Sequence, residues 1–149
     1  MAKRRSRQRE LPLVVCFVDE CLGSGDVPRA LMSCEGVDVQ LHRDHFDQGT
    51  RDVDWLPVVA GRGWVVLTKD VQITRRPIEV EAWKRAQAVV VALQSQSLNG
   101  SQQGAALAKA MPRIRGWLVR YRRPLIITVS RSGTPTVKFG ERVGARGRR

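Results

Sequence analysis

Five short runs of apolar, mostly β-branched residues recur along this chain, and their spacing constrains the fold more than any other feature. About 18 to 31 residues separate each run from the next. Hairpins need only a few connecting residues, whereas parallel strands need a crossover of a dozen or more. The spacing therefore predicts a parallel sheet with helical crossovers. The expected strands are 13–18, 37–41, 64–68, 89–93 and 125–129.

Helical patterns fill the spacers between these strands. Apolar residues in the longest one recur every three or four positions, as in Leu107, Met111 and Ile114, which indicates one buried stripe. Pro112 interrupts the hydrogen-bond ladder, so we expect a kink or a restart there. The whole pattern predicts an α/β fold: a three-layer α/β/α sandwich around a central, mostly parallel five-stranded sheet. Helices are expected at 24–34, 52–60, 77–86 and 104–121, with a last extended piece at 134–139.

Charge is distributed unevenly along the 149 residues, whose formal net charge is +12. Residues 11–81 hold twelve of the fourteen acids, whereas residues 82–149 hold fourteen basic residues and one acid. Such a surplus favours a polyanionic partner, nucleic acid before membrane. We expect one domain at 11–139, flanked by a basic flexible arm at 1–10 and a basic Gly/Arg-rich tail at 140–149.

Cysteine usage and apolar run length bear on the compartment. Cys16, Cys21 and Cys34 are an odd number and lack the spacing of a zinc site, which favours a reducing cytoplasm over a disulfide framework. No apolar run approaches the ~20 residues of a membrane span, and no signal-peptide cleavage pattern follows the basic N-terminus. We therefore expect a cytoplasmic protein that does not contact a membrane.

Acidic side chains follow two of the expected strands at the point where each strand ends. Asp19 and Glu20 come directly after the first strand, and Asp70 follows the third. Because the carboxyl ends of parallel strands meet at one edge of a sheet, Asp19 and Asp70 are expected to lie close together. Asp52 and Asp54 begin the helix before that third strand. Each acid alone is more often a cap or turn residue.

Clustered carboxylates repel one another unless a cation lies between them. Mg²⁺ or Mn²⁺ is the natural guest of such hard oxygen ligands, with water and substrate phosphate completing its shell. An ion of this kind activates water and neutralises charge that builds on a phosphate. An acidic pocket in a basic chain is therefore the combination that a metal-dependent nuclease needs.

Three motifs carry a resemblance to a known family. VDECL at 18–22, DVDWLP at 52–57 and GWVVLTKD at 63–70 resemble the PIN-like domain superfamily, especially its VapC-toxin-related branch. The resemblance covers about residues 12–138. It implies a parallel-sheet α/β/α fold, a Mg²⁺ or Mn²⁺ pocket, and hydrolysis of RNA phosphodiester bonds. Such proteins are often the toxin of a toxin–antitoxin pair.

The resemblance also assigns residues. Asp19 and Asp70 match the acids after the two strands and are expected to bind the metal. Asp54 is expected as the third catalytic acid, a ligand or a water-positioning group, with Asp52 behind it. Glu20 is a supporting residue of the same pocket.

The chain departs from the family pattern at two positions. Many relatives carry a further acid where this sequence has Gln72, and a small hydroxyl residue where it has Cys21. Fewer acids favour one tightly bound metal ion over two. The smaller set of acids is also consistent with a protein that has lost catalysis and binds RNA without cleaving it.

The leading hypothesis is a metal-dependent endoribonuclease, with RNA as its substrate. An antitoxin protein and a second copy of the chain in a homodimer are further candidate partners. The alternative hypothesis is a non-catalytic nucleic-acid-binding protein that uses the basic C-terminal half and the tails. A third hypothesis is an inactive interaction module held by a partner. The candidate contacts to the substrate are Lys69, Arg75, Arg76, Lys109 and Arg113.

Overall fold

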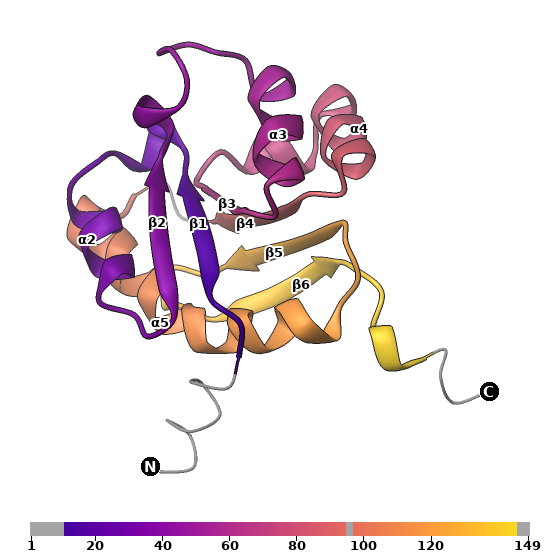
Figure 1. The fold of residues 1–149 in the computed structure, drawn as a ribbon. Coiled ribbons are helices and arrows are strands. Elements are labelled where there is room, and N and C mark those ends of the chain that lie inside the picture. Colours follow the sequence, from indigo (N-terminus) through magenta and orange to yellow (C-terminus); the bar gives the residue numbers. More distant parts are fainter. Residues whose placement is uncertain (1–10, 95–96, 146–149) are drawn as a thin grey trace.

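The centre of the molecule is a six-stranded sheet (Figure 1). A computed structural model describes residues 11–94 and 97–145. The strand order is β2-β1-β3-β4-β5-β6; β1 to β5 are parallel, and β6 is antiparallel to β5. The strands are β1 (Val14–Val18), β2 (Val37–Leu41), β3 (Val65–Thr68), β4 (Val89–Leu93), β5 (Leu125–Val129) and β6 (Pro135–Phe139).

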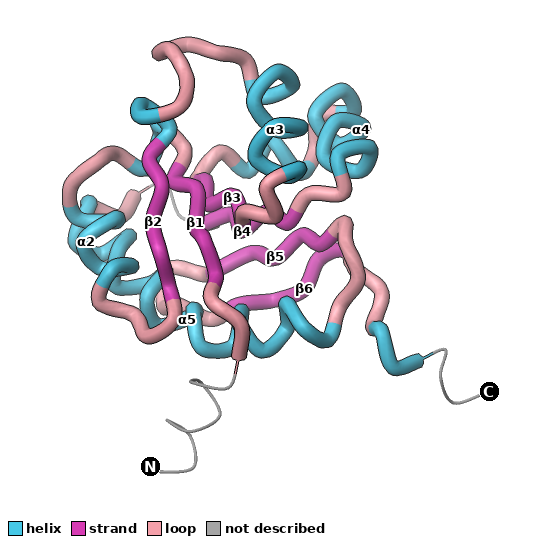
Figure 2. Tube along the Cα trace, in the orientation of Figure 1, coloured by secondary structure: helices cyan, strands magenta, loops and turns pink. Residues whose placement is uncertain are grey.

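Helices make every crossover between the parallel strands, as Figure 2 shows in cyan against the magenta sheet. Among the described residues, no helix combines the length and the apolar character that crossing a membrane requires. The α-helices are α2 (Asp26–Met32), α3 (Asp52–Gly61), α4 (Pro77–Ala86) and α5 (Gly100–Arg120). Short 3₁₀ helices follow several strands: η1 (Glu20–Leu22), η2 (His42–Asp44), η3 (Val71–Thr74) and, near the C-terminus, η4 (Val143–Ala145).

Two hydrophobic cores lie on opposite faces of the sheet. On one face α2 and α5 pack against side chains such as Cys16 and Leu67. On the other face α3 and α4 pack against the alternate side chains, among them Phe17, Val66 and Val90. Burial on both faces explains why the inner strands are apolar at nearly every position. The predicted three-layer α/β/α sandwich is confirmed.

The sheet has one strand more than the five that were predicted. The extended piece near the C-terminus is β6, which returns beside β5 through a tight turn. In this turn the Ser130 N–H donates to the Thr134 carbonyl at 3.0 Å, and the Gly133 N–H donates to the Ser130 carbonyl at 2.9 Å. Gly133 has a φ of 84°, which other residues rarely adopt. So short a connection permits only an antiparallel hairpin.

The helix α5 begins four residues before the predicted start and does not restart at Pro112. A capping box fixes its beginning: the Asn99 side chain accepts from the Gln102 N–H at 2.8 Å, and the Gln102 side chain accepts from the Asn99 N–H at 2.9 Å. Gly104 then lets α2 approach, because a Cβ there would lie 2.9 Å from the Ala30 Cβ. Tertiary packing therefore holds the helix together across the proline.

The first part of the expected C-terminal tail packs against the domain. The Arg122 N–H donates to the Glu141 carbonyl at 2.8 Å, and Arg142 forms an antiparallel bridge with Tyr121. The expected arm at 1–10 and the last part of the tail, 146–149, lie outside the described residues.

Candidate active site

Asp19 leaves β1 at the carboxyl edge of the sheet, where three donors hold its carboxylate. These are the Glu20 N–H at 2.8 Å, the Thr68 hydroxyl at 2.9 Å and the Cys21 thiol at 3.5 Å. The Asp19 N–H donates to the Leu67 carbonyl of β3 at 3.0 Å. Asp19 is 9% exposed, so its carboxylate has one fixed orientation at the end of the strand.

Asp70 leaves β3 at the same edge and is joined to Asp19 through one buried hydroxyl. The Asp70 N–H donates to Thr68 Oγ1 at 3.1 Å, and the same hydroxyl donates to Asp19 Oδ2. The Asp70 carboxylate accepts from the Gln72 N–H at 3.0 Å and so caps η3. Thr68 was not singled out from the sequence, although it is a hydroxyl residue at the end of a buried strand, two positions before Asp70.

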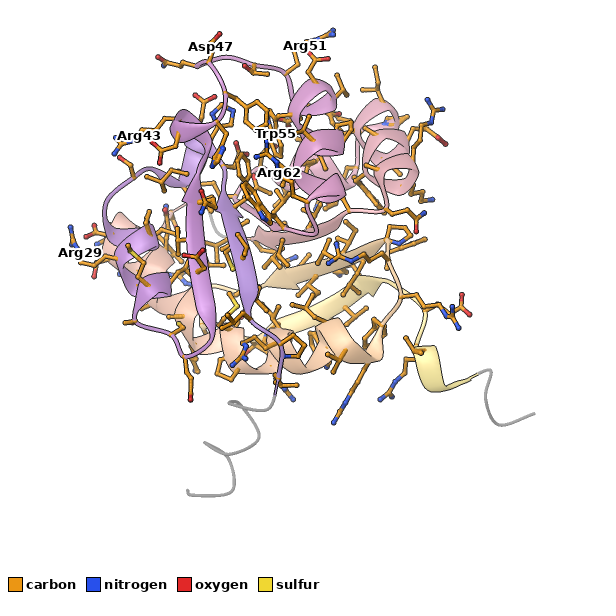
Figure 3. The ribbon with its side chains drawn as sticks, viewed as in Figure 1. Arg29, Arg43, Asp47, Arg51, Trp55 and Arg62 are labelled. Atoms are coloured by element: carbon orange, nitrogen blue, oxygen red, sulfur yellow. The ribbon has the colours of Figure 1, made fainter. Side chains whose placement is uncertain are left out.

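Asp52 faces this pair of acids from the first turn of α3. Burial raises the pKa of its carboxyl from 3.8 to about 6, and the charges of Asp19, Asp70 and Glu79 add to the rise. A side-chain hydrogen bond with Trp55 acts in the opposite direction. Figure 3 shows Trp55 on the inner side of α3. Carboxylates from three other segments of the chain thus act on the Asp52 carboxyl at this edge.

Asp54 lies apart from these acids, on the exposed side of α3. Its carboxylate accepts from Arg51 Nε at 3.0 Å and from Arg51 Nη2 at 3.3 Å. Arg51 lies at the outer end of α3 in Figure 3. Two residues along a helix differ by about 200° in direction, so Asp52 and Asp54 cannot face the same site. The structure brings Asp52 to the acidic cluster and leaves Asp54 with Arg51.

Glu79, in the first turn of α4, is an acid that sequence reasoning missed. It is 8% exposed. Its Oε1 accepts from Arg76 Nη1 at 3.1 Å, whereas its buried Oε2 has no hydrogen-bond partner in the described part of the chain. A buried carboxylate oxygen without a donor is costly unless a cation or water meets it. The sequence signal was weak, because acids are common in first turns for reasons of helix capping and dipole.

The Glu20 side chain points toward the segment that follows β2, the strand next to β1. Its Oε1 accepts from the Gly49 N–H at 3.2 Å and lies 3.2 Å from His42 Nε2. A cavity of about 260 Å³ opens beside it, lined by polar groups that include Ser24 and Arg43. Glu20 therefore connects η1 to the segment after β2, next to the acidic cluster.

Cys21 occupies the position where many relatives have a small hydroxyl residue. Its thiol lies 3.3 Å from Thr68 Oγ1 and accepts from the Lys69 N–H at 3.4 Å. Burial, with a smaller contribution from the Asp19 charge, raises the pKa of the thiol to about 11. The thiol is therefore protonated at neutral pH and donates to Asp19, as a hydroxyl would.

The predicted substrate contacts separate into two groups. Lys69 and Arg75 lie close to the acidic edge in sequence, directly before Asp70 and directly after η3, and Arg76 pairs with Glu79. Lys109 and Arg113 lie on α5, against the opposite face of the sheet from α3 and α4. There Lys109 Nζ donates to the Ser132 carbonyl at 3.0 Å, and the Arg113 guanidinium lies 6.0 Å from the centre of the Trp117 ring.

The acidic cluster suits a hydrated hard cation better than a fully enclosed one. Within residues 11–94 and 97–145, no group of three or more acid, His or Cys side chains lies close enough together to hold a metal ion. Mg²⁺ and Mn²⁺ keep several of their waters and bind proteins through one or two carboxylates. Such an ion would weaken the repulsion between Asp52 and the neighbouring carboxylates. It would also give Glu79 Oε2 a partner, directly or through water. The acids of the cluster therefore fit a Mg²⁺ or Mn²⁺ ion that binds through one or two carboxylates.

A comparison with protein families identifies this arrangement. A family model described as a PIN like domain matches residues 14–95, more than half of the chain. The chain belongs to the PIN-like domain family. The matched stretch runs from β1 through β4 and contains all four acids of the cluster. Searches of curated proteins and of solved structures found no match. PIN-like domains are commonly nucleases that use divalent metal ions, which places this PIN-like chain in a nuclease-type superfamily.

Proposed function

We propose that this PIN-like protein is a metal-dependent endoribonuclease. The observation that carries the proposal is that Thr68 joins Asp19 and Asp70 at one edge of the sheet. The charges of these two acids and of Glu79, after burial, contribute to the raised pKa of Asp52. Such convergence costs stability in the absence of a cation, so a capping role alone does not account for it. The acids lie within a chain of net charge +12, which favours a polyanionic substrate.

The residues of the cluster divide the work of holding the ion and its water. Asp19 and Asp70 would be the direct ligands, since each is held by hydrogen bonds just after a strand. Asp52 and Glu79 would accept hydrogen bonds from water around the ion, with Asp52 in the role that was expected of Asp54. When bound, the ion supplies water activation and neutralises charge on the phosphate in flight.

Thr68 and Cys21 keep this arrangement in place. Thr68 is fully buried and hydrogen-bonds both strand-end acids, which sets the orientation of Asp19 relative to Asp70. Cys21 donates to the oxygen of Asp19 that Thr68 also contacts. Both are positioning residues, because neither faces the reacting phosphate.

The test is cleavage of a panel of single-stranded and structured RNAs with Mg²⁺, Mn²⁺ or EDTA. Asp70→Asn should lower cleavage by at least ~100-fold, because the metal supplies several kcal/mol of transition-state stabilisation. Asp52→Asn should also lower it, whereas Asp54→Asn should not. Asp47→Asn is the matched control, since Asp47 lies exposed in the loop before α3 (Figure 3).

RNA binding without metal-dependent cleavage in the wild type would instead support the non-catalytic RNA-binding protein. The finer form of the proposal is a toxin restrained by an antitoxin. In that case expression of the wild type slows the growth of a bacterial host, and Asp70→Asn relieves the slowing at equal protein level. Equal slowing by both proteins would contradict a role for cleavage.

A further inference from the structure

A groove of about 360 Å³ lies between α4 and the β5–β6 half of the sheet. The core under α3 and α4 extends from Phe17 of β1 to Ile126 of β5, whereas Lys138 and Phe139 at the end of β6 stay exposed. Trp83 and Lys84 of α4 form one wall of the groove. Thr128 of β5 and Lys138 and Phe139 of β6 form the other.

The groove is cationic. Arg75, Lys84 and Lys138 line it, and no acid does so among the described residues. In the part of the chain that the structure describes, no carboxylate lies within 4 Å of these three cations. No carboxylate of the described residues therefore neutralises their charge. A phosphate backbone is the ligand that such a row of cations attracts.

The groove also presents an aromatic ring. Phe139 is 43% exposed. Its ring packs at 5.4 Å and an angle of 70° against the buried Trp83 ring, and the Lys84 ammonium lies 4.9 Å from its centre. Trp83 is itself fixed, because its indole N–H donates to the Ile73 carbonyl at 3.0 Å. Phe139 is thus a supported apolar surface at the mouth of a cationic groove.

Exposed aromatic rings beside cations are the pattern by which proteins bind single-stranded nucleic acid. Bases of a duplex are already stacked inside it, so a duplex offers no free base to Phe139. One end of the groove is formed by Val71 and Thr74 of η3, the short helix that Asp70 caps. The other end is at Phe139, which pairs with Ile126 near the amino end of β5. The groove therefore runs from the segment after Asp70 toward the opposite edge of the sheet.

We propose that this groove binds single-stranded RNA beside the acidic cluster, with phosphates on Lys84 and Lys138 and a base against Phe139. The inference rests on the proposed function, because it describes how the substrate of that same site is held. Binding is tolerant of base identity, since every base has a face to stack, and strongly dependent on salt.

The experiment measures binding without cleavage. A fluorescein-labelled oligouridylate is titrated with the full chain in EDTA over a series of salt concentrations, by fluorescence anisotropy. Lys84→Gln with Lys138→Gln should reduce the log–log salt slope by about 1.4, or about 0.7 for each lost contact. Arg29→Gln with Arg120→Gln, which removes the same two charges from α2 and α5 on the other face of the sheet, is the matched control and should reduce the slope less.

The aromatic contact is tested separately. Phe139→Leu should weaken binding about five-fold or more, while Phe139→Tyr keeps the ring and should bind like the wild type. Crosslinking of an oligonucleotide that contains 4-thiouridine should map to β6 in the unaltered protein. This second measurement does not depend on any variant folding.

The proposal is overturned if the two lysine changes lower the salt slope no more than Arg29→Gln with Arg120→Gln does. It is also overturned if Phe139→Leu binds normally, if the crosslink maps elsewhere, or if the wild type binds no RNA. Because binding is measured without metal, the two proposals fail separately. Normal binding by the groove variants with cleavage lost in Asp70→Asn rejects the groove alone. Weakened binding by the groove variants, with no metal-dependent cleavage by the wild type, rejects the nuclease alone.

Discussion

At the scale of single residues, folding raises the pKa of the Asp52 carboxyl. Its pKa of about 6 in the folded protein lies above the ordinary value of 3.8, so the folded state binds this proton more tightly than the unfolded chain does. The contribution of the protonated Asp52 carboxyl to the free energy of unfolding is therefore fully present below about pH 4 and is lost as the pH rises through about 6. Above about pH 6 the folded protein holds an ionised carboxylate at this position, which destabilises the metal-free fold.

Asp52→Asn should accordingly gain stability relative to the wild type as the pH rises from about 4 to about 7. The gain should reach about 1 kcal/mol, a value discounted because the carboxyl is partly exposed to solvent. Urea unfolding in EDTA at a series of pH values measures it, with Asp54→Asn as the control on the same helix. A gain that does not grow with pH would mean that Asp52 does not face the acidic cluster.

The same residue shows where prediction from the sequence ends. Asp19 and Asp70 were selected because each follows a buried strand, and the structure joins them through Thr68. The choice of Asp54 over Asp52 depended on how α3 is rotated against the sheet. Packing of Trp55 sets that rotation, and this information is tertiary. The pairing of Asp54 with Arg51 three residues earlier was the one local signal that favoured Asp52.

At the scale of elements, one arginine of α5 ties three segments of backbone together. Arg115 is 2% exposed. Its Nη1 donates to the Glu35 carbonyl at 3.0 Å, and its Nη2 donates to the carbonyls of Leu11 at 3.0 Å and Pro12 at 3.1 Å. Gly36 makes room for it, since a Cβ at that position would overlap the guanidinium. Burial of this charged group is tolerated because its two Nη atoms donate to three backbone carbonyls.

Gly36→Ala should therefore destabilise the protein by about 2 kcal/mol or more. About 1 kcal/mol comes from the φ of +72°, and the rest comes from displacing the Arg115 guanidinium. Gly63→Ala is the matched control, because Gly63 has a φ of +77° with open space around it and should lose only the backbone part. Chemical unfolding of both variants measures the difference, and equal losses would contradict the role given to Arg115.

Most elements followed from local patterns. The strands β2, β4 and β5 and the helix α4 have the predicted bounds, because β-branched runs and Pro77 at a helix start are strong local signals. The start of α5 was missed although Asn99 and Gln102 carry a capping-box pattern. The pairing of β6 was not assigned, since which strand an extended piece joins depends on the whole sheet.

At the scale of the whole molecule, the uneven charge seen in the sequence has a spatial counterpart. Acids from residues 19, 52, 70 and 79 meet at one edge, and cations from residues 75, 84 and 138 line a groove that begins beside it. The sequence predicted a polyanionic partner from the surplus alone. It could not predict the groove, because β6 and α4 come together only in the folded sheet.

The two terminal segments add a charge whose effect can be separated from that of the groove. Residues 1–10 carry five basic residues, and Arg146, Arg148 and Arg149 add three more. If they contact phosphates, deletion of 1–10 and 146–149 should weaken RNA binding and lower the log–log salt slope by about 0.7 for each lost contact. Anisotropy titrations of the truncated and full chains in EDTA measure this change.

The deletion should leave the metal response untouched. An ion that binds only the folded state raises the melting temperature, and the acids that hold it lie between residues 19 and 79. Mg²⁺ should therefore raise the melting temperature of the truncated and full chains equally, and raise that of Asp70→Asn less. An unchanged salt slope would show that the terminal segments do not contact RNA. A metal shift lost on truncation would contradict a site built from the acidic cluster alone.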